Sequence, residues 1–299
     1  MLRELADDAV VEEALPDVDW TPHAQPLKLL AALHYLVQEG RASWDHAPAA
    51  LREHAEFVRR YMADQSLQTN EVMRCWVLLP CFLEAARRAG VEQLDLIELG
   101  PSAGLNLVWD RYRYLYRHGV WGPDEAILEL RGEERTPVPA PLLELTPRVR
   151  SRTGIDVAPI DVTTDEGARV LKSFVWADQA WRLELLDRAI AAVRADPPEI
   201  IRGDVVDELP RLLARRRDDA LTIVWQTAVL GYLPPERRPL VEEALERAGR
   251  DRPLAYVEAG RPRHDEHRYW GMFVRLWPDG ACHLVAHADF HGAWLEWLE

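Results

Sequence analysis

The stretch LDLIELGPSAGLNLVWD, residues 94–110, constrains the fold more than any other part of the sequence. It begins with a short apolar run that carries Glu98 near its end and leads into a glycine-containing turn. This pattern is typical of a buried parallel strand, and we expect a helix to follow from about Leu105 to Tyr116. A strand, a glycine turn and a helix together indicate an α/β sheet with a ligand-binding edge at the turn.

The sequence after residue 94 alternates between strand-like and helix-like segments. Residues 197–204 are expected to form a strand and then a turn, residues 221–230 to begin as a strand, and residues 253–259 to form another strand. The expected helices cover residues 176–196, 207–216 and 234–249. The pattern of residues 272–299 predicts a hairpin that turns at Pro278-Asp279-Gly280. The expected fold class is therefore α/β, with a mostly parallel sheet that ends in a C-terminal antiparallel hairpin.

The sequence before residue 93 is predicted to be helical. Apolar residues recur at helical spacing in residues 26–40, 43–65 and 70–90, and two of these segments end at a glycine. We therefore expect an N-terminal helical cap, residues 1–92, followed by an α/β domain, residues 93–299. Residues 120–170 are rich in proline and glycine, which predicts an irregular insertion with one strand at AILEL.

The charge balance narrows the class of partner. The 299 residues include 50 acidic and 36 basic side chains, which give a formal net charge of −14 without a massed basic segment. This argues against a protein that binds nucleic acid by neutralising phosphates. The N-terminus lacks the pattern of a signal peptide, and no window has the run of apolar residues that a membrane span needs. We expect a cytoplasmic protein with a small-molecule substrate.

The cysteines and histidines do not predict a metal centre. The three cysteines, Cys75, Cys81 and Cys282, form no C-x-x-C motif, so neither a disulfide framework nor a zinc ribbon is expected. Three histidines lie four residues apart, at His283, His287 and His291, but their segment is predicted as strand and turn. Their spacing matches no zinc signature.

The GPSAG sequence matches the nucleophile elbow of an α/β-hydrolase, G-x-S-x-G, with Ser102 as the nucleophile. The order serine, acid, histidine is met downstream by Asp204 followed by His264, His267 or His287. In that fold, however, several strands and a glycine-rich oxyanion loop precede the elbow. Here the upstream 93 residues are predicted to be helical, so the hydrolase interpretation lacks its scaffold.

The alternative is a turn that holds a cofactor. Gly100 and Gly104 would let the backbone approach a ligand, and Glu98 would accept a hydrogen bond from an ammonium group such as that of S-adenosylmethionine. Ser102 would be part of the same turn. The sequence is neither G-x-G-x-x-G nor a P-loop, so NAD and nucleoside triphosphates fit less well.

Later strands supply further candidates for this cofactor site. Asp204 follows a predicted strand, where it would either meet the adenine amino group or cap the next helix. Gln226 lies at the end of the strand after that. The second strand of the sheet should end on an acid that holds the ribose hydroxyls, and two residues compete for that position, Glu129 in AILEL and Asp178.

Several blocks of sequence together resemble a bacterial family known as domain of unknown function 2332. The blocks are QTNEVMRC (68–75), IELGPSAGLNLVWDRYRY (97–114), RTGIDVAPIDV (152–162), VWADQAWRLELLDRA (175–189), GDVVDELP (203–210) and HGAWLEWL (291–298). This resemblance covers nearly the whole chain, and the family is described as similar to class I S-adenosylmethionine-dependent methyltransferases. It therefore implies a Rossmann-like sheet, without implying a particular substrate.

The resemblance draws attention to polar residues on either side of the first strand. In QTNE, residues 68–71, either Thr69 or Asn70 would cap a helix, or Asn70 would reach the cofactor. Asn106 and Asp110 fall on one face of the helix expected after the turn.

The function that we expect is methyl transfer from S-adenosylmethionine to an unidentified small molecule, which needs alignment of the two reactants rather than a nucleophilic serine. If a base is required, the candidates are His264, His267 and Asp110. Two alternatives stay open, a serine hydrolase that uses Ser102 and a non-catalytic module with a methyltransferase-like sheet.

Overall fold

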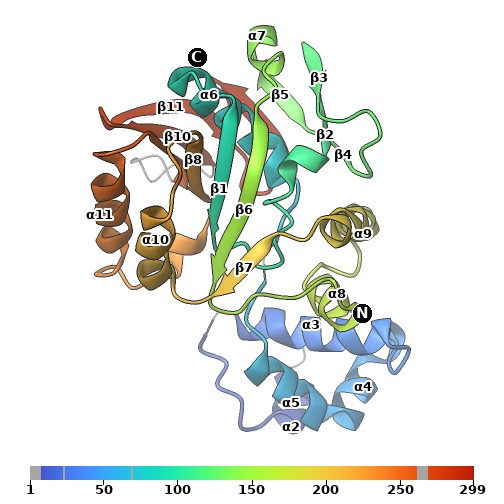
Figure 1. Cartoon of the computed structure of the whole chain (residues 1–299). Helices are drawn as coiled ribbons and strands as arrows, with labels where there is room; N and C mark the ends of the chain where they lie inside the picture. The colour runs from blue at the N-terminus through green and yellow to red at the C-terminus, as the bar shows by residue number, and fades with distance from the viewer. Residues whose placement is uncertain (1–7, 23, 69, 261–268) are drawn as a thin grey trace. The chain divides into compact units, whose positions relative to one another are not determined.

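The computed structural model describes residues 8–22, 24–68, 70–260 and 269–299. The chain forms two compact units, unit 1 with residues 1–70 and 160–190, and unit 2 with residues 71–159 and 191–299. Helix α9 (Ala180–Ala195) crosses from one unit to the other. Figure 1 shows the elements of both units.

Unit 1 is helical. Its other helices are α2 (Asp8–Ala14), α3 (Gln25–Gln38), η1 (Trp44–His46), α4 (Ala47–Glu53), α5 (Ala55–Asp64) and α8 (Asp165–Ser173). The core is built from apolar residues at helical spacing, such as Leu29, Leu33 and Leu36 of α3. Helix α8 begins where Thr164 accepts a hydrogen bond from the Gly167 amide at 3.0 Å.

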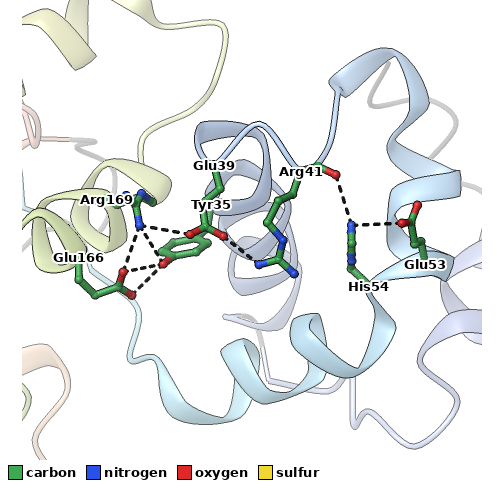
Figure 2. Close-up of polar contacts among 7 residues, drawn as sticks. All are labelled: Tyr35, Glu39, Arg41, Glu53, His54, Glu166 and Arg169. Carbon is green, nitrogen blue, oxygen red and sulfur yellow. Dashed lines mark hydrogen bonds and ion pairs between the residues drawn. The ribbon is translucent and has the colours of Figure 1, made fainter.

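Polar contacts join α8 to the N-terminal helices of unit 1. The Tyr35 hydroxyl donates to the Glu166 carboxylate at 2.7 Å and 2.8 Å, and Arg169 reaches Glu39 at 3.3 Å (Figure 2). Nδ1 of the buried His34 lies 3.2 Å from the Ser173 carbonyl oxygen and 3.0 Å from that of Val175. These contacts attach a segment distant in sequence to the first helices of the chain.

Within the described part of the chain, unit 2 forms a nine-stranded sheet in the order β5–β12–β11–β10–β9–β8–β1–β6–β7. The strands are β1 (Gln93–Leu99), β5 (Glu133–Thr136), β6 (Arg148–Asp156), β7 (Glu199–Arg202), β8 (Leu221–Gln226), β9 (Leu254–Gly260), β10 (Trp270–Trp277), β11 (Ala281–Ala288) and β12 (Trp294–Trp297). β7, β6, β1, β8 and β9 run parallel to one another, whereas β10 is antiparallel to both β9 and β11. The mostly parallel α/β sheet with a terminal hairpin is therefore confirmed.

Helices cover both faces of this sheet. Helix α6 (Arg74–Ala89) packs against β8, β9 and β10 on one face, where Phe82 meets Trp225 with 5.1 Å between ring centroids. Helices α10 (Val205–Ala214) and α11 (Arg238–Gly249) share the other face (Figure 1) and bury a core that includes Ile97, Val224 and Tyr256. Alternate residues of each strand therefore face different helices.

The segment after β1 differs from the expectation. Residues 100–108 form a series of turns, followed by η2 (Trp109–Arg111) and β2 (Arg113–Tyr116), so the expected helix from Leu105 to Tyr116 is wrong. Tertiary hydrogen bonds explain the difference. The buried Tyr112 hydroxyl donates to the Leu105 carbonyl, and the Tyr114 hydroxyl donates to that of Trp109, both at 2.7 Å. These contacts outweigh the helical propensity of the segment.

Residues 120–170 are also more regular than expected. β3 (Gly119–Trp121) and β4 (Glu129–Arg131) pair with β2 in a smaller sheet, and β5, α7 (Ala140–Leu143), β6 and α8 follow. The boundaries change as well, because α6 belongs to unit 2 and residues 160–190 belong to unit 1. Among the described residues, no helix is long and apolar enough to cross a membrane.

Candidate functional site

The candidate site lies at the carboxyl ends of the parallel strands of unit 2. From β1 the chain goes on to the neighbouring β6 and then to β7, and it later returns to β8 and β9 on the other side of β1. β1 and β8 are therefore adjacent strands whose connections run in opposite directions. In open α/β sheets, ligands bind outside the carboxyl ends of strands at such a point.

The turn after β1 is tight because three residues have left-handed backbone. Gly100, Ser102 and Gly104 have φ values of 73°, 55° and 75°. A Cβ on Gly100 would lie 2.8 Å from Val229, and one on Gly104 would lie 2.8 Å from Pro198. The space beside both glycines is thus filled by other side chains of the protein. The expectation that these glycines make room for a ligand is not supported here, and close packing of the turn explains them.

Asp156 holds this turn from the neighbouring strand. It is the last residue of β6, and its carboxylate accepts the Ser102 amide at 2.8 Å and the Ala158 amide at 2.8 Å. Because β6 is the parallel strand that follows β1 in the chain, Asp156 is the acid at the end of the second strand. The sequence reasoning missed it, although it lies in the quoted block RTGIDVAPIDV. An acid directly after the buried Ile155 is the signal that could have revealed it.

Glu98 is the most unusual side chain of the site. It is 3% exposed, and its Oε2 atom has no hydrogen-bond partner among the described residues. Burial and, to a smaller extent, the charge of Asp156 raise the pKa of Glu98 to about 8. Hydrogen bonds from Asn106 and Trp225 and the charge of Arg74 act to lower it. A buried carboxyl oxygen without a partner is costly unless it is protonated or a ligand supplies a donor.

The start of α6 and the turn provide the surroundings of Glu98. Cys75 donates its thiol hydrogen to Asn106 Oδ1 at 3.2 Å, so Asn106 links α6 to Glu98. Arg74 donates to Thr227 Oγ1 at 3.2 Å and to the Phe290 carbonyl at 3.1 Å. Its guanidinium lies 5.0 Å from the centroid of the Trp270 ring. Polar groups from α6, β1, β8 and the loop before β12 therefore meet on one face of the sheet.

The two ribose candidates lie outside the large sheet. Glu129 lies in β4 of the smaller sheet, is exposed and sits 3.8 Å from Arg113. Asp178 lies in a turn of unit 1 and is also exposed. Neither residue ends the second strand of the large sheet, and Asp156 occupies that position.

Three further predicted residues have identifiable contacts. Asp204 caps α10 by accepting the Val206 amide at 2.9 Å, and it pairs with Arg237 at 2.7 Å, so the capping alternative is confirmed. Gln226 ends β8 but faces α10 and α11 rather than Glu98. Asn70 is the last residue of unit 1 and is not the N-cap of α6, since that helix begins at Arg74. Thr69 lies outside the described residues.

Of the three candidate bases, the structure describes only Asp110. Both carboxylate oxygens of Asp110 accept hydrogen bonds from Arg152, at 3.0 Å and 2.5 Å, which assigns Asp110 a structural ion pair. His264 and His267 lie outside the described residues, in the segment between β9 and β10. His287, the third histidine of the hydrolase order, pairs with Glu296 at 3.2 Å on the hairpin.

The comparisons with known proteins agree with the sequence resemblance. Residues 1–297 match the model of a family described as "Uncharacterized protein conserved in bacteria (DUF2332)", and the chain belongs to that family. No curated protein matches the sequence.

Among solved structures, the chain is similar to a S-adenosylmethionine-dependent methyltransferase from Clostridium acetobutylicum ATCC 824. The identity is 11%, the alignment covers 75% of this chain and 74% of the other, and the TM-score is 0.29. A likeness of this size carries no functional argument, which therefore rests on the strand order and the site.

Proposed function

We propose that unit 2 is a Rossmann-like domain of the class I methyltransferase type, which binds S-adenosylmethionine at the carboxyl edge of β1, β6 and β8. In this proposal the protein transfers the methyl group to a small molecule. The parallel strands, taken in chain order, stand in the sheet as third, second, first, fourth and fifth. This is the order of doubly wound sheets that bind nucleotides at the switch point.

The observation that carries the proposal is the buried Glu98. Its Oε2 atom lies at the switch point without a partner among the described residues, so an ammonium group brought by a ligand would supply the missing donor. The methionine portion of S-adenosylmethionine carries such a group. The arriving positive charge would favour the ionised carboxylate, and Glu98 would release its proton.

Asp156 supports the same assignment from the second strand. Each of its carboxylate oxygens accepts one backbone amide, and each keeps a lone pair for a further donor. The side chain is partly exposed, as is Val157 after it, which is 65% exposed. Asp156 would therefore hold the two ribose hydroxyls, while the turn at Gly100 to Gly104 keeps its backbone fixed.

The residues of this chain would act mainly by positioning. S-adenosylmethionine supplies an electrophilic methyl group on a sulfonium centre. Glu98 and Asp156 would fix the two ends of the cofactor, and the hydrogen-bonded series Cys75–Asn106–Glu98 would keep the first of these side chains in place. Holding the reactants in line contributes most of the rate enhancement in such a displacement.

Calorimetric titration of S-adenosylmethionine and S-adenosylhomocysteine tests the proposal. We expect micromolar binding to the wild type, and a loss of about tenfold or more in Glu98→Gln and in Asp156→Asn, because each removes a charge-assisted hydrogen bond. Glu129→Gln is the matched control, since Glu129 is an exposed acid on the smaller sheet. A folded wild type that binds neither compound would contradict the proposal.

One observation favours the serine hydrolase as a second candidate. Ser102 has a φ of 55°, the strained backbone expected of a nucleophile elbow. Against it, β1 is preceded by no strand among the described residues, and the segment after the turn is not a helix. Covalent labelling of Ser102 by a fluorophosphonate, abolished in Ser102→Ala, would replace the methyltransferase proposal. We expect no labelling.

A further inference from the structure

A second polar cluster lies on the opposite face of the same strands. Gln226 of β8 pairs with Glu258 of β9, and Tyr256 is two residues before Glu258 on the same face. Val224 and Tyr256 belong to the core beneath α10 and α11, so this cluster faces α11. It is therefore separate from Glu98, whose strand partner Trp225 faces α6.

The cluster contains more acceptors than donors. Gln226 Nε2 donates to Glu258 Oε1 at 3.4 Å, which leaves Gln226 Oε1 without a partner among the described residues. The Tyr256 hydroxyl is buried next to the Gln226 side chain, which acts to lower the pKa of Tyr256 against the larger rise caused by burial. Gln226 is 3% exposed and Tyr256 is 4% exposed, whereas Glu258 is partly accessible. Two buried oxygens and a carboxylate with access to solvent thus lie close together at the edge of the sheet.

We propose that Gln226, Tyr256 and Glu258 form the subsite for an amine, which is the methyl acceptor of the proposed reaction. An ammonium group donates up to three hydrogen bonds and carries one positive charge, which matches the oxygens of Gln226 and Tyr256 and the Glu258 carboxylate. A divalent cation fits less well, because Ca²⁺ takes six to eight oxygen ligands and Mg²⁺ needs octahedral coordination, whereas this cluster offers three side chains.

Glu258 would also prepare the amine for attack. An ammonium nitrogen has no lone pair, so it must lose a proton before it accepts a methyl group. In this step the N–H bond breaks, its electron pair stays on nitrogen and the proton moves to the Glu258 carboxylate. Burial and the charge of Glu242 raise the pKa of Glu258, while Arg275 and Gln226 lower it. A carboxylate with a raised pKa is a better base than an exposed glutamate.

Saturation-transfer NMR with n-butylamine and its isostere n-butanol tests the subsite without any cofactor. We expect butylamine to bind the wild type, butanol not to bind, and Glu258→Gln to weaken butylamine binding by about tenfold. Tyr256→Phe should weaken it several-fold. The exposed acid Glu243 on α11 provides the control, and Glu243→Gln should change the affinity less than twofold. Equal binding by wild type and a folded Glu258→Gln, or equal binding of butanol, would overturn the proposal.

The pH dependence of the same titration gives a second readout. Butylamine affinity should rise as the pH increases from 4.5 through the raised pKa of Glu258, because the ionised carboxylate binds the cation. The other titratable or charged groups that face Glu258 are Tyr256 on β9, Glu242 on α11 and Arg275 on β10. In Glu258→Gln the rise should disappear, and a rise that persists would assign it to another group.

The amine subsite rests on the proposed function, but separate binding measurements test the subsite and the cofactor site. Glu258→Gln should bind S-adenosylmethionine as tightly as the wild type, because Glu98 and Asp156 are intact. Cofactor binding without butylamine binding would remove the subsite and leave the methyltransferase proposal. Butylamine binding without cofactor binding would leave an amine site and remove its assignment as the methyl acceptor.

Discussion

The cluster of His34, Tyr61 and Ser173 in unit 1 and the carboxyl edge of the sheet in unit 2 both bury polar side chains, but they pair them differently. In unit 1, His34 reaches two carbonyl oxygens and the Tyr61 hydroxyl meets Ser173 Oγ at 2.6 Å. At the edge of unit 2, Glu98 Oε2 and Gln226 Oε1 have no partner among the described residues. Paired groups hold a fold together, whereas unpaired buried groups need an explanation.

The two regions also respond to pH with opposite signs. Burial lowers the pKa of His34, so protonation destabilises the folded state as the pH falls through the range around 6.5. Burial raises the pKa of Glu98 to about 8. Between pH 4.5 and that value the carboxyl ionises in the unfolded chain but stays protonated in the folded one, so the free energy of unfolding falls as the pH rises. Around neutral pH, therefore, the neutral form of His34 makes hydrogen bonds without a penalty from protonation, whereas burial of Glu98 has a cost in stability.

The largest expected effect is on Glu98. Glu98→Gln should increase the free energy of unfolding relative to the wild type, by a difference that grows by about 1.4 kcal/mol for each pH unit between 4.5 and about 8. The reason is that the Glu98 carboxyl ionises more readily in the unfolded chain than in the folded one, which favours unfolding as the pH rises. A glutamine side chain does not titrate, so the variant lacks this pH dependence. Urea unfolding at a series of pH values measures the difference. A gap that does not change with pH would mean that Glu98 is not the titrating group.

A smaller effect is expected in unit 1. His34→Leu should destabilise the protein by about 2 kcal/mol at pH 7.5, because it leaves two buried carbonyl oxygens without their donor. Hydrogen exchange of the α3 and α8 amides localises the change. Exposed His46 is the control, and His46→Leu should be close to neutral. A neutral His34→Leu would remove the distinction between the two regions.

The smallest effect concerns the turn after β1. Ser102→Gly should stabilise the protein by about 1 kcal/mol, since glycine adopts a φ of 55° without the strain that serine carries. Thermal unfolding measures it, and a destabilised variant would show that the serine side chain outweighs the strain. Gly104→Val is unsuitable as a binding test, because its added atoms would meet Pro198 and perturb the fold.

Apolar runs explain which elements could be predicted from the sequence. β1, β7, β8, β9 and the hairpin of β10 and β11 were all expected, because their buried residues are close together in the sequence. β6 was missed because RVRSRTGID is mostly polar, with burial concentrated at Gly154 and Ile155. The helix expected after the turn failed for another reason, since Tyr112 and Tyr114 are fixed by hydrogen bonds to carbonyls in the preceding turns and η2.

The site could be predicted only in part for the same physical reasons. Glu98 was found because a strand and a glycine turn mark it. Asp156 was missed together with its strand, so Glu129 and Asp178 took its place in the prediction. Glu258, Tyr256 and the Gln226 oxygen have no sequence signal, because burial and pairing arise from contacts between strands and helices.

The central claim is that the buried Glu98 carboxyl receives the ammonium group of S-adenosylmethionine. Calorimetric titration at pH 7, repeated in buffers with different ionisation enthalpies, counts the protons released on binding. Because the pKa of Glu98 is about 8, the wild type should release close to one proton for each cofactor bound, and Glu98→Gln should release almost none. Tight binding without proton release, or equal release by both proteins, would contradict the account.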